Sequence, residues 1–335
     1  MDTTDTPQIA VIILNWNGRR FLEEYLPEVI RTTDPALGRV IVADNASTDG
    51  SQELMAERFP QVELIKFDRN YGFAEGYNRA IAAVDAPWVV LLNSDVRTGE
   101  NWLAPLWEYV TSNSDVAAVQ PKILSIKNPD TFEYAGAAGG FIDTNGYPYC
   151  RGRIFDTCEK DNGQYDTPAD IFWATGAALM VRRDIYLSTG GLDKEFFAHM
   201  EEIDLCWRIR LAGYRIAAVP ASTVYHLGGG SLPAENPRKT YLNFRNNLLM
   251  MHKNLPDGIR GRKLLVRRLL DTVAFFRFIL GFDFPNARAV IRAHNDFRRM
   301  APSYTAHPAV SLLPQSPNIL VQYFLRGRKT FGSLK

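Results

Sequence analysis

The fold is decided by the stretch Trp88-Val89-Val90-Leu91-Leu92-Asn93-Ser94-Asp95. Its five leading apolar residues predict a β-strand that is buried on both faces. Two small polar residues and a carboxylate follow at once, so they stand at the carboxyl end of this strand. In open α/β sheets, ligands bind outside the carboxyl ends of the strands. Asp95 is therefore placed to hold a hard cation or a polar ligand, unless it only caps the next helix.

Apolar strands alternate with helical patterns on the N-terminal side of this stretch. Further strands are predicted at residues 9–14, 39–43 and 62–66, and helices at residues 19–30, 51–58 and 72–83. Such alternation is typical of βαβ units. It predicts an α/β fold, with a mostly parallel sheet flanked by helices.

The rhythm changes beyond about residue 97. Residues 129–167 are rich in Gly, Tyr, Asp and Pro, which predicts loops and short strands over one end of the sheet. Regular elements are predicted on both sides of that segment: helices at 102–111, 184–189 and 203–211, and strands at 171–173, 177–181, 214–220 and 222–226.

Composition limits the class of protein. The 335 residues carry a formal net charge of +1, so bulk charge predicts no nucleic-acid partner. Cys150, Cys158 and Cys206 are too few and too scattered for a disulfide framework, and reduced thiols suit a cytoplasmic protein. Residues 1–8 lack the features of a signal peptide, and no run of about 18 apolar residues predicts a spanning helix.

The C-terminal part is basic and amphipathic. One face of a predicted helix carries Leu265, Leu269, Val273, Phe276 and Leu280. Residues 326–335 add four basic side chains. Such a region fits docking on an anionic membrane surface, and it fits equally well packing against the rest of the chain or a second subunit.

Two further groups of carboxylates could carry chemistry. Asp44 ends the strand at 39–43 and shares a crevice with Asp95 if the two strands are neighbours, although it could also cap the next helix. Glu201, Glu202 and Asp204 lie together at the start of a predicted helix. Repulsion and burial would raise the pKa of at least one of them, as a general base needs, whereas the helix dipole would lower it.

His226 ends an extended segment and precedes Gly228-Gly229-Gly230. A lone histidine is more often a structural residue than a ligand. Together with Asp95, however, it would give a mixed oxygen and nitrogen site for a cation. Arg238, Lys239 and Arg245 follow soon after and could meet phosphates.

In this order, the segments resemble the family-2 glycosyltransferases of the GT-A fold, and most closely the rhamnosyltransferase-like members. The resemblance covers about residues 8–255. It rests on Ile12-Ile13-Leu14-Asn15-Trp16-Asn17, residues 44–51, Asn70-Tyr71-Gly72-Phe73-Ala74 with Asn78, Asn93-Ser94-Asp95, Trp173-Ala174-Thr175-Gly176-Ala177, residues 191–197 and 201–208, His226 and Arg245-Asn246. No single motif is decisive, whereas the ordered set is highly specific.

The resemblance implies a role for each matching residue. The implied nucleotide-sugar ligands are Asn15, Asp44, Asn70, Asn93, Ser94 and Asp95; the metal ligands are Asp95 and His226; Arg245 would bind phosphate; Trp173 and Asp204 would bind the acceptor. Asn93 replaces the first acidic residue of the family's metal-binding "DxD" motif, so Asp95 is the motif's one carboxylate. Glu202 matches the family's base, with Glu201 and Asp204 as alternatives.

The implied reaction is an inverting transfer of a sugar, with rhamnose as one candidate. The sugar would pass from a nucleotide diphosphate to a hydroxyl of a glycan or lipid-linked acceptor, assisted by Mg²⁺ or Mn²⁺. The reaction would contribute to the synthesis of a cell-surface polysaccharide or glycolipid. The enzyme would lie in the cytoplasm or peripherally on the inner face of the cell membrane.

The resemblance also implies an organisation of the chain. A catalytic domain would span residues 8–255, divided into a nucleotide-binding half (8–100) and an acceptor half (101–255), and a helical basic extension would span 256–335. A non-catalytic sugar- or nucleotide-binding module and a sugar nucleotidyltransferase remain alternatives. Asn15-Trp16-Asn17-Gly18 argues against the latter, since such enzymes ordinarily carry a Gly-rich, Arg-containing loop after the first strand.

Overall fold

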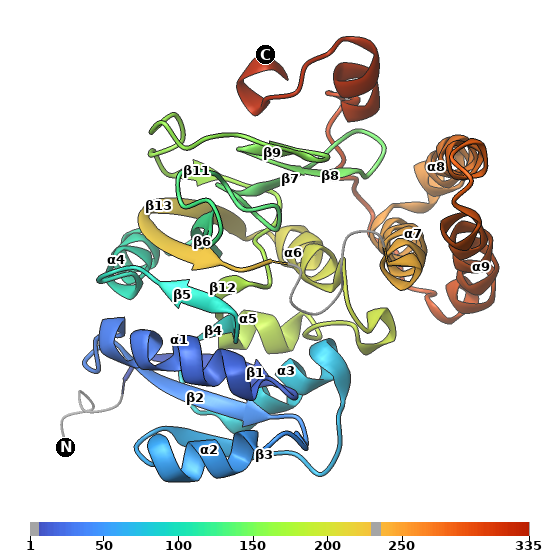
Figure 1. The fold of residues 1–335 in the computed structure, drawn as a ribbon. Helices are drawn as coiled ribbons and strands as arrows, with labels where there is room; N and C mark the ends of the chain where they lie inside the picture. Colours follow the sequence, from blue (N-terminus) through green and yellow to red (C-terminus); the bar gives the residue numbers. More distant parts are fainter. Residues whose placement is uncertain (1–6, 229–235, 335) are drawn as a thin grey trace.

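A mixed β-sheet with helices on both faces forms the centre of the molecule (Figure 1). The computed structural model describes residues 7–228 and 236–334, so Gly229 and Gly230 of the glycine run lie outside the described residues. Within those ranges, nine strands join this sheet in the order β11-β13-β6-β12-β4-β1-β2-β3, with β5 paired to β13. Their bounds are β1 Ile9–Asn15, β2 Gly38–Asp44, β3 Glu63–Lys66, β4 Trp88–Asn93, β5 Val96–Thr98, β6 Val116–Ser125, β11 Ala169–Asp170, β12 Ala178–Arg182 and β13 Arg215–His226.

Two sets of helices cover the two faces of the sheet. One face carries α1 (Arg19–Thr32), α2 (Ser51–Arg58) and α4 (Leu103–Ser112), and the other carries α3 (Gly72–Ala83), α5 (Arg183–Ser188) and α6 (Glu201–Leu211). α1 shows why: Leu22, Leu26 and Val29, spaced three or four residues apart, are all buried against the sheet. The predicted α/β fold is confirmed.

Parallel pairing aligns the strand ends at which a site is predicted. β1 runs parallel to β2 and to β4, with Asn15 opposite Asp44 and Leu14 opposite Asn93. Beyond residue 100 the pairing changes, because β12 runs antiparallel to both β4 and β6. The polar side chains that end β1, β2 and β4 therefore share one edge of the sheet.

Several strands differ from the sequence prediction. β6 runs through the sheet although no strand is predicted there, since buried Gln120 and Lys122 interrupt its apolar pattern. Residues 171–173 follow β11 instead of forming a strand themselves. The extended segments at 214–220 and 222–226 are one strand, β13, whose register shifts between Val219 and Thr223.

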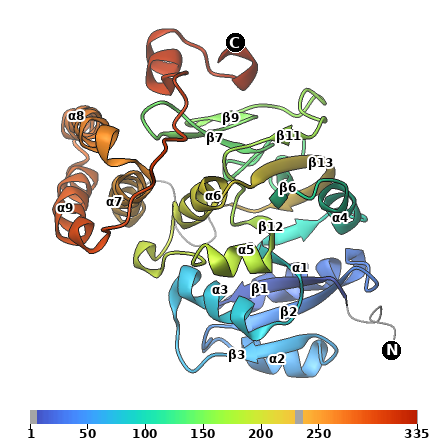
Figure 2. The same cartoon turned by 180° about the vertical axis from the view of Figure 1, so that it is seen from behind.

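The segment predicted as loops and short strands forms a second, smaller sheet over one end of the first. Its strands are β7 (Gly140–Ile142), β8 (Pro148–Cys150), β9 (Arg153–Ile154) and β10 (Thr157–Cys158). The end of the chain returns to this sheet (Figure 2). Ile319 N donates to Asp143 Oδ2 (3.0 Å), and Phe331 packs against Phe141.

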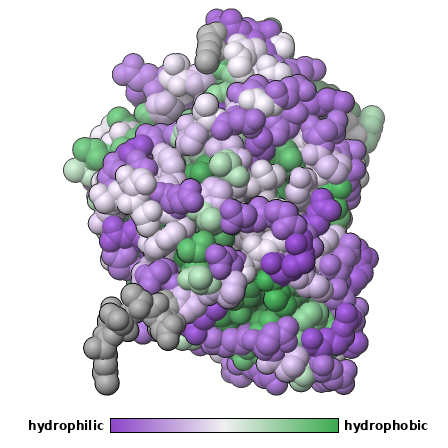
Figure 3. Space-filling model, turned by 90° about the vertical axis from the view of Figure 1, so that its left-hand side faces the viewer, coloured by the Kyte–Doolittle hydropathy of each residue, from purple (hydrophilic) through white to green (hydrophobic). Residues whose placement is uncertain are grey.

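Three long helices lie beside the main sheet: α7 (Pro237–Asn254), α8 (Asp257–Leu280) and α9 (Phe284–Met300). α7 is packed most deeply, with Leu248 and Met250 fully buried in the core. No helix in the described part of the chain is long and apolar enough to cross a membrane. The side of the molecule opposite α8 and α9 is mostly hydrophilic, with a patch of apolar side chains in its lower half (Figure 3).

Candidate active site

The ends of β1 and β2 bring Asn15 and Asp44 together. Asn15 Nδ2 donates to Asp44 Oδ2 (3.0 Å). The other oxygen of Asp44 accepts from the Ser47 backbone N–H (2.9 Å) and from the Gln52 amide (2.7 Å). Both Asn15 and Asp44 are buried, so these partners hold the Asp44 carboxylate in a single orientation at the edge of the sheet.

Asn70 lies just before α3, next to this edge. Its Oδ1 accepts from the Gly72 backbone N–H (2.8 Å) and from Asn45 Nδ2 (3.0 Å), which ties the start of α3 to the end of β2. Gly72 has φ +76°, a conformation that favours glycine. Asn70 is exposed, so it can meet a ligand while it holds this turn.

Asp95 and His226 meet where β4 and β13 end. His226 Nε2 lies 3.2 Å from Asp95 Oδ1 and 3.4 Å from Asn93 Nδ2, while Nδ1 lies 3.2 Å from Glu133 Oε2. Burial alone would lower the pKa of His226, but the two carboxylates outweigh burial and raise that pKa to about 10. His226 is therefore an imidazolium held between two carboxylates at neutral pH. Ser94, half-buried, stands beside them at the end of β4.

Glu133 is the member of this cluster that the sequence patterns miss. It lies in the irregular segment 129–167 and is buried, and its Oε2 also accepts from the Ala135 backbone N–H (2.5 Å). The sequence feature that comes nearest to indicating Glu133 is the glycine run after His226. Gly228 is needed there because a Cβ on it would clash with the Glu133 carboxylate. Only the fold brings these distant segments together.

Asp95 and His226 could supply two ligands to a divalent cation whose other positions a diphosphate and waters would fill. Among the described residues, no group of three His, Cys, Asp or Glu side chains forms a cation site by itself. Mg²⁺ and similar ions are commonly held by one or two protein ligands, with phosphates and waters filling the other positions. Asp95 and His226 match that pattern, provided that the ring first releases its Nε2 proton.

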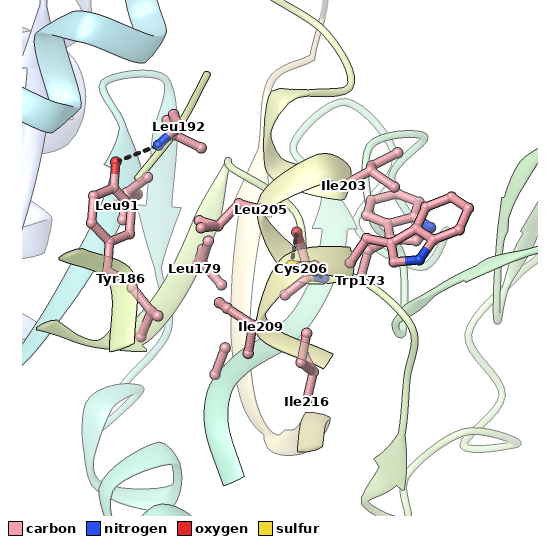
Figure 4. Packing of buried hydrophobic residues seen from close by; sticks show 14 of the residues in the cluster. Leu91, Trp173, Leu179, Tyr186, Leu192, Ile203, Leu205, Cys206, Ile209 and Ile216 are labelled. Atoms are coloured by element: carbon pink, nitrogen blue, oxygen red, sulfur yellow. Dashed lines mark hydrogen bonds between the residues drawn. The ribbon is translucent and has the colours of Figure 1, made fainter. Parts of the chain in front are cut away.

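The second group of carboxylates begins α6. The turn before it carries three residues with positive φ: Phe197 (66°), His199 (68°) and Met200 (72°). The side chains that follow fix α6 in the core, among them Ile203, Leu205, Cys206 and Ile209 (Figure 4). The start of the helix, with its carboxylates, is thereby held in one place.

Glu202 lies beside the segment that precedes β12. A Cβ built on Gly176 would lie 3.7 Å from Glu202 Cβ and 3.3 Å from the Phe73 ring of α3. The next residue, Ala177, accepts a hydrogen bond from the Asn93 backbone N–H (3.0 Å) at the end of β4. Glu202 is thus one short segment away from the cluster around Asp95.

Among the described residues, neither Glu201 nor Glu202 forms an ion pair with a cation. Within the described residues, neither Glu201 Oε2 nor Glu202 Oε2 has a hydrogen-bond partner. Burial raises the pKa of Glu202 to about 7. Burial and the neighbouring Glu202 charge raise the pKa of Glu201 well above its ordinary value. Because Glu201 is buried and Glu202 only half-buried, Glu202 is the better placed of the two to exchange a proton near neutral pH.

Asp204 does not fit the acceptor role predicted for it. Its fully buried carboxylate accepts from Arg208 (2.9 Å), Lys253 (2.9 Å) and Asn254 (2.7 Å). Burial would raise the pKa of Asp204, but the two cations outweigh it and lower that pKa. Asp204 therefore joins α6 to α7 and is closed to a substrate or a proton.

Arg245 and Trp173 are likewise occupied by structural partners. Arg245 Nη2 donates to the backbone carbonyls of Glu195 and Phe196 (2.9 Å each), so its guanidinium holds the turn before α6 instead of facing open space. Trp173 is buried and donates from Nε1 to the Phe141 carbonyl (2.9 Å). The phosphate and acceptor roles predicted for these residues do not match the contacts that they make.

A hollow of about 460 Å³ opens beside the strand ends. The Leu227 backbone N–H in its lining donates to the Asp95 carbonyl (3.1 Å), so the hollow borders the cluster around His226. Arg20 and Lys127 contribute the cations of the lining. The full lining is Asn17, Gly18, Arg20, Phe21, Lys127, Leu227 and Gly228. The hollow is large enough and basic enough for a phosphorylated ligand.

Comparison with known proteins then fixes the family. The model of the family described as "Glycosyl transferase family 2" matches residues 10–186, more than half of the chain. The chain belongs to glycosyltransferase family 2. It is a glycosyltransferase of the GT-A fold, as its ordered motifs indicate, and the alternatives of a binding module and a nucleotidyltransferase are set aside.

Relatives in sequence include rhamnosyltransferases. The chain is 28% identical over 239 residues to the N-acetylglucosaminyl-diphospho-decaprenol L-rhamnosyltransferase of Mycobacterium tuberculosis, covering 66% of this chain and 76% of the relative. It is 24% identical over 229 residues to rhamnosyltransferase WbbL of Escherichia coli K12, covering 65% of this chain and 83% of the relative. In sequence, the chain is thus similar to rhamnosyltransferases.

Similar solved structures have the same fold. The mannosyltransferase PcManGT from Pyrobaculum calidifontis, in complex with GDP-Man and Mn²⁺, is 16% identical with a TM-score of 0.53 over 91% of this chain and 78% of that one. S. aureus TarS 1-349 with UDP-GlcNAc is 14% identical with a TM-score of 0.58 over 88% and 81%. GalNAc-T7 with UDP, GalNAc and Mn²⁺ has a TM-score of 0.58 at 16% identity, and this chain spans 49% of its length.

Proposed function

We propose that this family-2 glycosyltransferase moves a sugar, with rhamnose as the first candidate, from a nucleotide diphosphate to a hydroxyl of a lipid-linked glycan, with inversion at the anomeric carbon. One observation carries the proposal. Glu202 is a carboxylate without a cation or a hydrogen-bond partner at its Oε2 among the described residues, and it lies beside Gly176, whose neighbour Ala177 pairs with the end of β4.

The donor would bind along the strand ends, in residues 8–100. Asp44, oriented by Asn15, would accept from the nucleoside, and Asn70 lies exposed beside it. Asn93, Ser94 and Asp95 would lie along the diphosphate. Asp95 and deprotonated His226 would hold Mg²⁺ or Mn²⁺, and such an ion supplies positive charge that stabilises the leaving diphosphate. The solved relatives PcManGT and GalNAc-T7 were both obtained with Mn²⁺, which supports a requirement for a cation.

Glu202 would act as the general base. The acceptor hydroxyl forms a bond to the anomeric carbon, the bond from that carbon to the diphosphate oxygen breaks, and Glu202 takes the hydroxyl proton. A base is most effective when its pKa lies near the working pH, and burial raises the pKa of Glu202 to about 7. Burial and the neighbouring Glu202 charge raise the pKa of Glu201 well above its ordinary value, which favours its neutral form.

The acceptor half of the catalytic domain would span residues 101–255, and residues 256–335 would be an extension. The first-named relative acts, by its name, on a diphospho-decaprenol carrying N-acetylglucosamine. A similar acceptor would bring a second diphosphate to the site, and the hollow with Arg20 and Lys127 offers cations for it. Nucleotide sugars and the free thiols of this chain both suit the cytoplasmic side of the cell membrane.

Two measurements test the proposal. Thermal shifts with UDP-, GDP- and dTDP-sugars, with and without Mn²⁺, should show stabilisation by one donor that depends on the metal. Transfer of labelled sugar from that donor to a polyprenyl-diphosphate glycan should then be lost in Glu202→Gln and retained in Glu201→Gln. Stabilisation by none of these donors, or full transfer by Glu202→Gln, would contradict the proposal.

A further inference from the structure

An apolar stripe runs along the outer face of α8. The stripe consists of Leu265, Leu269, Val273, Phe276 and Leu280, which follow one another at intervals of three or four residues. These side chains are between 56% and 79% exposed. They span about 22 Å of helix at a rise of about 1.5 Å per residue. Monomeric soluble proteins rarely expose a continuous apolar face of this extent.

The apolar surface continues past the end of α8. Phe282, in the turn to α9, is 80% exposed, and Phe284, at the start of α9, is 52% exposed. α8 and α9 stand at the outer edge of the molecule, away from the main sheet (Figures 1 and 2). Among the described residues, the rest of the chain leaves this surface uncovered.

The inner face of α8 holds a buried ion pair next to Leu264. Arg267 and Asp271 are both buried, and Arg267 Nε donates to Asp271 Oδ1 (2.8 Å). Arg267 also donates to Asn247 of α7, and His294 Nε2 of α9 lies 3.1 Å from Asp271 Oδ2. A helix at a water-exposed surface has the opposite arrangement, with its apolar side inward. The outer face of α8 therefore suits contact with an apolar partner.

The sign of the net charge changes where α8 begins. Residues 257–335 contain 14 Lys and Arg against 4 Asp and Glu, a formal net charge of +10, whereas residues 1–256 contain 24 against 33, a net charge of −9. Exposed Arg262 and Arg277 adjoin the stripe on α8, and α9 carries exposed Arg288 and Arg292. An apolar face flanked by basic residues is the combination that binds anionic bilayers. A second copy of the chain would instead bring the same positive charge to the contact.

We propose that the stripe and the arginines beside it dock on an anionic lipid bilayer, with α8 lying in the plane of the interface. The apolar side chains would enter the boundary of the acyl chains while the arginines meet lipid phosphates. This surface goes beyond the proposed function. It would also keep the enzyme at the bilayer that holds a lipid-linked acceptor.

Vesicle flotation of the full chain tests this docking surface. The chain should float with vesicles of phosphatidylcholine and phosphatidylglycerol, less with phosphatidylcholine alone, and less again when salt is raised. The double variant Leu269→Gln/Val273→Gln should lower the partition coefficient on the mixed vesicles by about tenfold or more. Arg277→Gln/Arg288→Gln should lower it on the mixed vesicles only.

A matched control and a second measurement keep the test decisive. Leu187→Gln on α5, another exposed apolar position (43%), should float like the unmodified chain. Circular dichroism and sedimentation velocity would verify that each variant is folded and report its oligomeric state. Equal flotation of the stripe variant and the unmodified chain would overturn the proposal. So would a dimer without vesicle binding that the stripe variant turns into a monomer.

The two proposals can fail separately. Flotation requires neither donor nor transfer, so a chain that does not float can still transfer sugar to a detergent-dispersed acceptor. Conversely, Glu202→Gln should float like the unmodified chain whatever its activity is.

Discussion

Replacing Glu202 by glutamine should abolish transfer and stabilise the folded protein at the same time. The substitution keeps the shape of the side chain and removes its charge. In the folded protein burial raises the pKa of Glu202 to about 7, whereas an ordinary glutamate has a pKa of 4.5. Between pH 4.5 and pH 7, Glu202 therefore keeps its proton in the folded state and has lost it in the unfolded state. The stability contributed by Glu202 falls as the pH rises through this window, and the full cost is present above pH 7.

The size of the effect follows from the difference in pKa. A difference of one pKa unit corresponds to about 1.4 kcal/mol, so ionised Glu202 costs at most about 3 kcal/mol at pH 8. Glutamine carries no such cost. With an unfolding entropy of about 2.1 cal/mol/K per residue, the variant should melt about 4 °C higher at pH 8. At pH 4.5 the gain should fall to about 0.4 kcal/mol, because Glu202 is then protonated in the folded state and half protonated in the unfolded state.

Calorimetry at pH 4.5 and pH 8, together with a transfer assay, checks this reasoning. Transfer by Glu202→Gln should fall by a factor of about 100 to 10,000, and kcat of the unmodified enzyme should rise with pH up to about 7. The exposed Glu57 of α2 supplies the control, since Glu57→Gln should change neither quantity. A variant that is no more stable at pH 8, or that gains equally at both pH values, would refute the argument from burial.

Other predictions concern the donor site and the frame that holds it. Asp95→Asn should lower affinity for Mn²⁺ in the presence of nucleoside diphosphate by about 10- to 100-fold, measured by titration calorimetry. Asp44→Ala should raise KM for the donor by about tenfold or more with little change in kcat, because it removes binding that is equal in ground and transition states. Asp204→Asn should lower the free energy of unfolding by about 3 kcal/mol, measured by denaturant titration, while kcat of the folded fraction stays within severalfold. The substitution removes the carboxylate that pairs with Arg208 and leaves Lys253 with Asp193. Gly140→Ala should also destabilise the fold, by about 2 kcal/mol on the same measurement, because its Cβ would overlap the Trp173 ring.

The sequence predicts the donor half of the molecule well because its signals are local. The β-branched and aliphatic run of β1 and the run of β4 each end in polar residues, and parallel pairing alone then places Asn15, Asp44 and Asp95 at one edge. The βαβ pattern fixes both the strands and their direction. No long-range contact has to be known for this part of the site.

The contacts that the sequence does not predict join distant segments. In the sequence, Asp204 is one of three clustered acids. In the structure, its carboxylate accepts hydrogen bonds from Lys253 and Asn254, some fifty residues later. Glu133 has no local pattern, and it reaches His226 only because the small sheet folds over the end of β13. The stripe on α8 is visible as an amphipathic pattern, but its direction is not: the sequence leaves open whether it faces the protein, and the structure turns it outward.

The start of α6 therefore holds carboxylates whose pKa values the fold shifts in opposite directions. Asp204 receives Arg208 and Lys253, which lower its pKa despite complete burial. Glu202, two residues earlier, receives neither cation, and burial raises its pKa. Environments that drive the pKa values of neighbouring acids apart separate a group that must stay charged from one that must exchange a proton. The ion pairs of Asp204 fix α6 to α7. Glu202 makes no ion pair with a cation among the described residues, as the proposed role of general base requires.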